Sequence, residues 1–224
     1  MKATLISIIF VLFLVCSILS KPVRVDVIFE SRCGESRRFV TRSFSKLKFV
    51  PGWEKYLEVN LWAYGNASQR FEDGKWKFTC QHGESECLGN MIITCSQKIL
   101  KTDVFNKFVV CFLDNIMEND NQFETVTQCS SHNVSNQLED CVNDRGSFKG
   151  SELQHHVAVF THGLTVKHEY VPHILVEGVN NINTENYILG SIKNYACLAS
   201  KGVLFGCEHQ DSFIQFDKTK RSKN

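Results

Sequence analysis

Hydrophobic and polar residues alternate twice in the early part of the chain, on either side of a helical pattern. Val23 to Phe29 and Leu57 to Ala63 alternate as half-buried strands do. Between them, from Ser36 to Lys48, apolar residues recur on one helical face, and Pro51-Gly52 ends the segment. Strand, helix and strand in this order predict a right-handed βαβ unit with a parallel strand pair.

Later in the chain the patterns are mainly helical. A strand is expected from Tyr170 to Gly178, entered through Pro172. Six cysteines lie between residues 65 and 150 or so, and we interpret this stretch as a disulfide-stapled helical insertion in an α/β domain that covers residues 21–207. Apolar residues at helical spacing predict helices over Asp103–Glu118, Ser135–Val142, Ser151–His162 and Thr184–Leu198.

The first twenty residues have the pattern of a secretory signal peptide. Lys2 precedes an apolar run from Leu5 to Leu19, and cleavage is expected after Ser20. An uncleaved signal anchor is the alternative, although the run is shorter than the about 20 residues that span a bilayer comfortably. No later stretch is apolar enough to span one, so the mature chain is expected to be exported and soluble. Residues 208–224 form a polar, basic tail.

Charge and cysteine content narrow the functional classes. The 25 Lys and Arg residues nearly balance 24 Asp and Glu residues, and this net charge of +1 argues against a nucleic-acid partner. Ten cysteines minus Cys16 of the signal leave nine, of which eight can form four disulfides in an oxidising compartment; spacing does not determine the pairing. Asn66 and Asn133 begin glycosylation sequons, which predict exposed loops.

The cysteine left over is most economically Cys33, which follows the first strand and precedes the first helix. A Cys-x-x-Cys sequence at such a junction is the redox site of thioredoxin-like proteins, but Ser36 occupies the fourth position here. A helix N-terminus favours an anionic thiolate through its dipole and its unpaired N–H groups. The alternative is that Cys33 forms a structural disulfide and that another thiol is free.

A string of cysteines and polar residues in the middle of the chain is highly specific. From Cys80 to Asn90 it is Cys-Gln-His-Gly-Glu-Ser-Glu-Cys-Leu-Gly-Asn, and Cys95 follows five residues later. It resembles, at every fixed position, the signature Cys-Gln-His-Gly-x-x-Glu-Cys-x-x-Asn-x-x-x-x-Cys of the gamma-interferon-inducible lysosomal thiol reductase (GILT) family. The segment up to Cys33, residues 62–67 and Tyr170-Val171-Pro172 also resemble that family.

The resemblance implies a thioredoxin-like fold and the reduction of protein disulfides, in endolysosomal compartments for well-known members. The family's Cys-x-x-Cys motif maps onto Cys33 and Ser36. The redox site is therefore expected at the same place in this chain, whereas the full two-thiol reaction cycle of the family is not expected. A cis peptide bond is expected before Pro172, with the Val171 backbone offering hydrogen bonds to an extended substrate; the alternative is a trans proline at a strand entry. The other cysteines are expected to be structural, and nothing in the sequence gives the first three a helix-start environment: Cys80, Cys87, Cys95, Cys111, Cys129, Cys141, Cys197 and Cys207.

Two functional hypotheses follow. The first is a secreted or endolysosomal thiol–disulfide oxidoreductase with Cys33 as nucleophile, in which Ser36 donates a hydrogen bond to the thiolate or caps the helix. A small thiol or another substrate cysteine must then release the mixed disulfide, which suits isomerisation, deglutathionylation or covalent capture. Its partners would be disulfide-containing proteins or small thiols, and no cofactor is expected. The second is a redox-inactive secreted glycoprotein that binds extended polypeptides in a cleft beside Pro172.

The histidines are expected to have lesser roles. His82 lies between Cys80 and Cys87, but the spacing is not that of structural zinc sites, so no metal is expected there. Five other histidines are close in sequence and are expected on the surface or on helix faces, where they can sense acidic pH: His155, His156, His162, His168 and His173.

Overall fold

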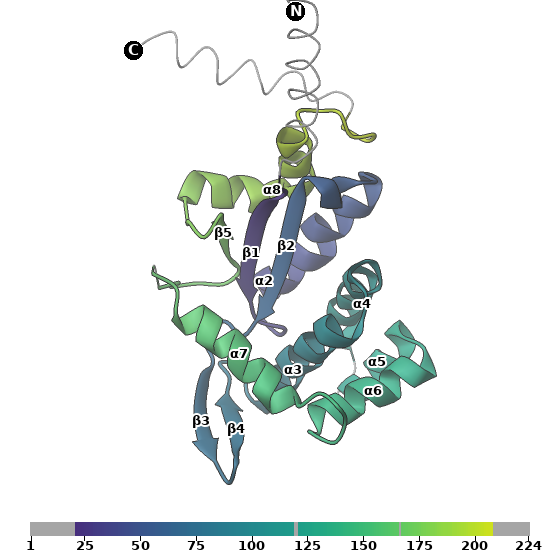
Figure 1. The fold of residues 1–224 in the computed structure, drawn as a ribbon, viewed down its shortest axis with the longest axis vertical. Coiled ribbons are helices and arrows are strands. Elements are labelled where there is room, and N and C mark those ends of the chain that lie inside the picture. The colour runs from purple at the N-terminus through teal and green to yellow at the C-terminus, as the bar shows by residue number, and fades with distance from the viewer. Residues whose placement is uncertain (1–20, 119–120, 166, 208–224) are drawn as a thin grey trace, which may run out of the picture.

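The computed structural model describes residues 21–118, 121–165 and 167–207; the expected signal peptide and basic tail lie outside this range. The described residues form a mixed α/β structure, as predicted. A three-stranded sheet with the order β2-β1-β5 occupies the upper half of Figure 1, and helices α3 to α6 gather below and beside it. A separate two-stranded hairpin projects at the opposite end from helix α8.

The predicted βαβ unit is present. Strands β1 (Val23–Phe29) and β2 (Leu57–Ala63) are parallel and paired along their whole length. Strand β5 (His173–Val176) pairs with β1 from the other side and runs antiparallel to it. β5 is shorter than the strand predicted from Tyr170 to Gly178, because the chain turns back on itself after Val176.

Strand β1 is buried more deeply than its alternating sequence predicts. It is the central strand, and its residues from Val25 to Phe29 are all buried, Asp26 included. The Asp26 carboxylate is compensated by hydrogen bonds from Trp62 Nε1 at 2.9 Å and Arg24 Nε at 3.1 Å. The expectation of a half-buried strand is therefore wrong, and a paired carboxylate makes the burial of the polar position tolerable.

The helical segment after Cys33 is irregular. The single helix predicted from Ser36 to Lys48 consists of an α-helix α2 (Gly34–Arg38), a π turn η1 (Phe39–Ser43) and a 3₁₀ helix η2 (Phe44–Phe49), followed by the short η3 (Trp53–Lys55). Side-chain hydroxyls bond to carbonyl oxygens four residues earlier, Thr41 to Arg37 O and Ser45 to Thr41 O. Such bonds compete with the regular backbone ladder.

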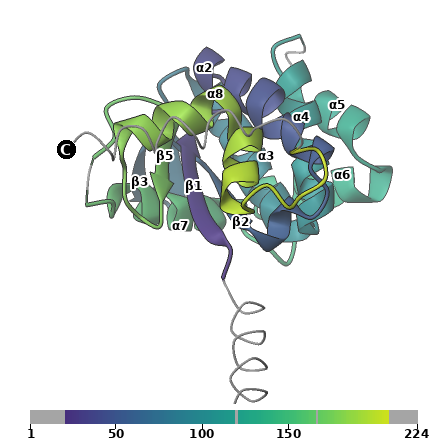
Figure 2. The same cartoon turned by 90° about the horizontal axis from the view of Figure 1, so that it is seen from above.

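Helix α8 (Ile182–Ala199) is bent where it meets this segment. Ser191 has non-helical backbone angles, φ −164° and ψ 97°, and Figure 2 shows the helix as two rods at an angle. At the bend the Ser43 hydroxyl donates to Ile188 O at 3.4 Å and accepts from Ile192 N at 3.1 Å. Because these two backbone groups would bond each other in a regular helix, the inserted hydroxyl accounts for the kink.

The region predicted to be a helical insertion contains more structure than expected. A hairpin of β3 (Ser68–Glu72) and β4 (Lys75–Thr79) precedes the helices and was not predicted. Helices α3 and α5 were also not predicted, whereas α4, α6 and α7 agree with the sequence patterns. The helices are α3 (Glu84–Ile99), α4 (Thr102–Asn115), α5 (Gln122–Cys129), α6 (His132–Val142) and α7 (Gly150–His162).

One hydrophobic core joins the sheet to these helices. It runs from Val27 and Phe29 of β1 through Val40 of η1 to Phe108 and Phe112 of α4, all buried. Among the described residues, no helix combines the length and the apolar character needed to cross a bilayer. The hydrophobic core therefore connects the end of β1, close to the N-cap residue Cys33, to the sheet and to the helices that pack against it.

Candidate active site

Cys33 lies at the junction between strand β1 and helix α2. It is the N-cap residue of α2, and its carbonyl accepts from Arg37 N at 3.0 Å. In the described part of the chain it is the one cysteine outside a disulfide, and its side chain is half-buried. A free thiol thus stands at the end of the central strand.

Val171 and Pro172 lie beside this thiol although they are far away in sequence. Cys33 Sγ is 3.7 Å from Val171 O, within the range of a weak thiol hydrogen bond. The peptide bond between Val171 and Pro172 is cis, and strand β5 begins at the next residue. The pairing of β5 with β1 is what brings the two segments together.

Ser36 has a different role from the two that were expected. It is buried inside α2, and its hydroxyl oxygen accepts from Glu30 N at 3.3 Å. The N-cap is Cys33, so the expectation that Ser36 caps the helix is wrong. The Ser36 side chain instead ties the first turn of α2 to the loop that leads to the thiol.

The other eight described cysteines form four disulfides. Two of the bonds connect helices, and one closes the short loop at the start of α3. Cys87 lies in the first turn of α3, so the expectation that it has no helix-start environment is wrong, but the bond leaves it no free thiol. The pairs are Cys80–Cys87, Cys95–Cys141, Cys111–Cys129 and Cys197–Cys207.

The string from Cys80 to Cys95 holds the loop before Cys33 in place. Asn90 Oδ1 accepts from Ser31 N at 2.9 Å, and the Ser31 hydroxyl donates to Glu86 O at 3.1 Å. An added Cβ on Gly89 would lie 2.5 Å from Ser31 Oγ, so only glycine allows α3 to approach this closely. The first turns of α3 therefore form a platform for the residues that precede the thiol.

Sequence reasoning missed two buried carboxylates at this contact. Glu30 and Glu86 are both fully buried, with His82 half-exposed between them. His82 Nδ1 is 2.5 Å from Glu86 Oε2 and 3.5 Å from Glu30 Oε2, and Glu30 Oε1 accepts from Asn66 N at 2.7 Å. Glu86 could have been identified from its fixed place in the string from Cys80 to Cys95. For Glu30 the sequence gives no indication beyond its position at the end of a strand.

Within the described part of the chain, these three residues form a group whose ligand atoms lie within 4.8 Å of one another, close enough to be considered as ligands of a cation. Ligand atoms on one zinc ion lie about 3.4 Å apart, since tetrahedral Zn–N and Zn–O bonds are about 2.1 Å long. The 2.5 Å contact between His82 and Glu86 is shorter, and it is the geometry of a hydrogen bond. Cys80 and Cys87 are bonded to each other and offer no thiolate to His82.

Burial raises the pKa of the Glu30 carboxyl above its ordinary value of 4.5; the Glu86 charge adds to the rise, and hydrogen bonding from Asn66 and the charge of His82 oppose it. A raised pKa means that the folded chain binds this proton more tightly than the unfolded chain does. The resulting stabilisation is complete below about pH 4.5 and is lost as the pH rises through the higher folded value.

A Glu30→Gln variant should therefore melt at a higher temperature than the parent at pH 7, with the difference shrinking toward pH 4. The amide keeps an oxygen for Asn66 N and carries no charge to desolvate. Thermal melts between pH 4 and pH 7 measure this. Glu58→Gln, at an exposed carboxylate of β2, is the control and should shift little across the range. A Glu30→Gln curve parallel to that of the parent would contradict the assignment.

A histidine and a glutamate support the segment that carries Pro172. His173 is buried, and its Nδ1 lies 3.2 Å from Glu185 Oε1, so the expectation of a surface position is wrong for it. The buried Glu185 also accepts from Ile174 N at 2.8 Å and from the Tyr170 hydroxyl at 2.7 Å. The hydrogen bond to Glu185 raises the pKa of Tyr170 to about 12. Helix α8 thus anchors both ends of the Val171–Pro172 segment.

The two sequon asparagines are both exposed. Asn66 lies in the turn after β2, as expected, whereas Asn133 lies in the first turn of helix α6, so the expectation of a loop is wrong there. Asn66 Nδ2 donates to Gln81 Oε1 at 3.0 Å. Glycosylation at either position stays a prediction.

A groove of about 440 Å³ opens beside the thiol segment. One wall is the helical segment from Glu35 to Lys46, and the other comprises Tyr170, Val171 and Pro172 with Leu189 and Gly190 of α8. Val171 belongs to this lining and also contacts Cys33, so the groove lies beside the thiol, although Cys33 itself does not line it.

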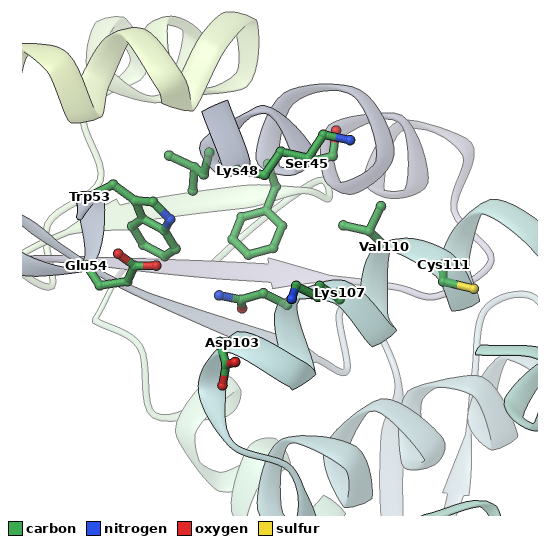
Figure 3. A pocket seen from close by; sticks show the side chains of 11 residues that line it. Ser45, Lys48, Trp53, Glu54, Asp103, Lys107, Val110 and Cys111 are labelled. Carbon is green, nitrogen blue, oxygen red and sulfur yellow. The ribbon is translucent and has the colours of Figure 1, made fainter. Parts of the chain in front are cut away.

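A second cavity, of about 330 Å³, lies between η2 and α4 (Figure 3). Trp53 and Phe44 form part of its apolar lining, and its charged residues are Lys48, Lys107, Glu54 and Asp103. Cys111 borders it but is bonded to Cys129. Since neither Cys33 nor Pro172 lines it, this cavity is not part of the thiol site.

Comparison with known proteins indicates the family of this chain. The family model described as gamma interferon inducible lysosomal thiol reductase (GILT) matches residues 24–144, which include Cys33, Ser36 and the string from Cys80 to Cys95. Gamma-interferon-inducible lysosomal thiol reductase of Mus musculus is 34% identical over 161 residues, which cover 70% of this chain and 61% of the mouse protein. The protein of the same name from Carassius auratus is 28% identical over 199 residues, 82% of this chain and 70% of its own length. The chain thus spans less than two thirds of the mouse relative.

Proposed function

Because the chain belongs to the gamma-interferon-inducible lysosomal thiol reductase family, we propose that it is a thiol–disulfide oxidoreductase acting through the single thiol Cys33. The observation that carries this is the position of Cys33: a free thiol that begins helix α2, 3.7 Å from Val171 O. Backbone N–H groups at a helix start favour the thiolate, which is the reactive form.

We propose that the fold is thioredoxin-like. The parallel β1–α2–β2 unit, the antiparallel β5 and the cis bond before Pro172 opposite the thiol support this. In that arrangement the backbone of Val171 binds an extended substrate segment beside Cys33. The helices between β4 and β5 then constitute an insertion stapled by disulfides.

The reaction proposed uses one protein thiol. The Cys33 thiolate attacks a substrate disulfide, forms a bond to one sulfur, and expels the other as a thiolate. A second thiol, from outside the chain or from the substrate, then attacks the mixed disulfide and releases Cys33. Ser36 carries a hydroxyl and cannot make this second attack, so dithiol reduction is slower or absent.

We place the protein in the secretory pathway, secreted or endolysosomal. Four disulfides fit an oxidising compartment, and the mouse relative is named as lysosomal. The expected signal peptide points the same way but lies outside the described residues.

Alkylation of the native protein tests the assignment of the thiol. One thiol per chain, mapped by peptide mass spectrometry to Cys33, should react with iodoacetamide before unfolding, and eight cysteines should react only after unfolding and reduction. A label on another cysteine, or no label, would contradict the enzyme proposal.

The second candidate function is a redox-inactive glycoprotein that binds extended polypeptides in the groove. The absence of a second thiol at position 36 and the groove beside Pro172 favour it. Cys33→Ser separates the two: disulfide exchange should disappear if the protein is an enzyme, whereas a binding protein would keep its partner affinity and effect unchanged.

A further inference from the structure

The groove beside Cys33 is basic along one wall. Arg38, Arg42 and Lys46 line it, spaced four residues apart along α2, η1 and η2. All three are exposed. Helical side chains lean toward the N-terminus of their helix, so this row leans toward the end that carries Cys33.

Among the residues that the structure describes, two of these cations have no ion-pair partner. Arg38 forms an ion pair with Glu35 at 2.9 Å, which also lines the groove. Within residues 21–118, 121–165 and 167–207, no carboxylate lies within 4.0 Å of the side-chain nitrogens of Arg42 or Lys46. The groove therefore offers two positive charges in excess to whatever binds next to the thiol.

Much of the remaining lining of the groove is apolar. Phe39, Pro172 and Leu189 line it, and the Tyr170 hydroxyl is engaged by Glu185. Its volume of about 440 Å³ is in the range of sites for small molecules, which is about 300–1,000 Å³. A tripeptide, about 10 Å long when extended, matches this scale.

We propose that this groove binds a small acidic thiol of tripeptide size, of the glutathione type, in mixed disulfide with Cys33. The inference rests on the proposed oxidoreductase function and names its co-reactant. The carboxylates of the ligand contact Arg42 and Lys46, and the apolar floor packs against its backbone. The groove thereby favours the external thiol that must replace the missing fourth-position cysteine.

The reaction balances as a transfer of the acidic thiol. The Cys33 thiolate attacks the glutathione sulfur of a protein–glutathione disulfide, forming Cys33–S–S–glutathione and releasing the protein thiolate, which takes up a proton. A second glutathione thiolate attacks the glutathione sulfur on Cys33, releases the Cys33 thiolate and leaves as glutathione disulfide. The protein–glutathione disulfide and one glutathione thiol thus become a protein thiol and glutathione disulfide, so that the protein sulfur is reduced and one glutathione thiol is oxidised.

Three disulfide probes of different charge test the proposal on the folded chain, with Cys33 as a free thiol and the four disulfides intact. Oxidised glutathione is anionic, hydroxyethyl disulfide neutral and cystamine cationic. The rate of mixed-disulfide formation on Cys33, followed by intact-protein mass spectrometry, should be highest for oxidised glutathione, relative to the same probes with a free unstructured cysteine peptide. Raising the salt concentration should reduce this preference.

A double variant that reverses the charge of the groove is the more decisive test. Arg42→Glu with Lys46→Glu should slow the reaction with oxidised glutathione about tenfold or more, leave hydroxyethyl disulfide nearly unchanged and accelerate cystamine. Lys48→Glu is the matched control: Lys48 is exposed on the same 3₁₀ helix but lines the second cavity, and the change should alter each rate less than about twofold.

The outcomes separate this inference from the proposed function. If Cys33 reacts with all three probes without a charge preference, or if the double variant slows all three equally, the acidic-thiol site is wrong and the oxidoreductase proposal stands. If no probe reacts with Cys33 in the parent, the oxidoreductase proposal itself fails.

Discussion

A Ser36→Cys variant should convert the protein into a catalytic dithiol reductase, with turnover of a model protein disulfide at least about tenfold above that of the parent. Side chains three residues apart at a helix start have Cβ atoms about 5–6 Å apart, within about 2 Å of the separation in a disulfide. A second thiol held this close attacks a mixed disulfide at a very high effective concentration, on the order of 10⁵ M in favourable intramolecular reactions. The mixed disulfide that accumulates on Cys33 in the parent should become transient.

Ser36→Ala is the control for this prediction, because it removes the same hydroxyl from Glu30 N without adding a thiol. Both variants leave a buried N–H without its acceptor, at a cost of about 1–3 kcal/mol. Turnover should therefore rise in Ser36→Cys alone. A folded Ser36→Cys protein without added reductase activity would show that the loop does not have dithiol geometry, and the binding function would be favoured.

Replacement of Cys95 and Cys141 by alanine should cost about 4 kcal/mol of unfolding free energy, a large fraction of the about 5–15 kcal/mol that is usual for a folded domain. The disulfide joins helices α3 and α6 across 46 residues, so its removal frees a long loop in the unfolded state. Both sulfurs are buried in the core, and the truncation also removes packing there. Denaturant titration under non-reducing conditions measures the loss.

The Cys197–Cys207 bond is the matched comparison, since both of its cysteines are buried but only ten residues separate them. The same chain-entropy argument gives about 3 kcal/mol for its replacement by alanines. A smaller loss for the Cys95–Cys141 pair than for the Cys197–Cys207 pair would contradict the argument that the longer closed loop gives the larger stabilisation.

Much of the fold follows from local patterns, and the exceptions have physical reasons. The parallel pair β1–β2 and helices α4, α6, α7 and α8 have clear periodicity and were predicted with nearly correct limits. Helix α3 was missed because its first two turns carry the family string of glycines, cysteines and acids, whose placement depends on contacts with Ser31 rather than on propensity. The irregular course of η1 and η2 depends on hydroxyl bonds that periodicity does not encode.

The candidate site was predictable as far as single motifs allow. Cys33 and the Val171–Pro172 segment were identified from the sequence string and the resemblance, and the structure places them in contact. The role of Ser36 could not be predicted from the sequence, because its hydroxyl accepts a hydrogen bond from Glu30 N only through the way the loop folds back. The Glu30–His82–Glu86 cluster joins two segments, the loop after β1 and the string that begins at Cys80, and no single stretch of sequence contains it.

The Ser43 hydroxyl has a consequence for how binding specificity in this groove can change. From the opposite wall of the groove, it forms hydrogen bonds with two backbone groups of α8, Ile188 O and Ile192 N. The same hydroxyl therefore holds both the bend at Ser191 and the helical segment that follows Cys33. The frame of the groove is therefore set by a buried side chain, whereas its charge is set by the neighbouring exposed residues Arg42 and Lys46. The charge of the groove can therefore be changed at the exposed positions without altering its frame, whereas a replacement of Ser43 that lacks a hydroxyl removes the contacts to Ile188 O and Ile192 N that join the two walls.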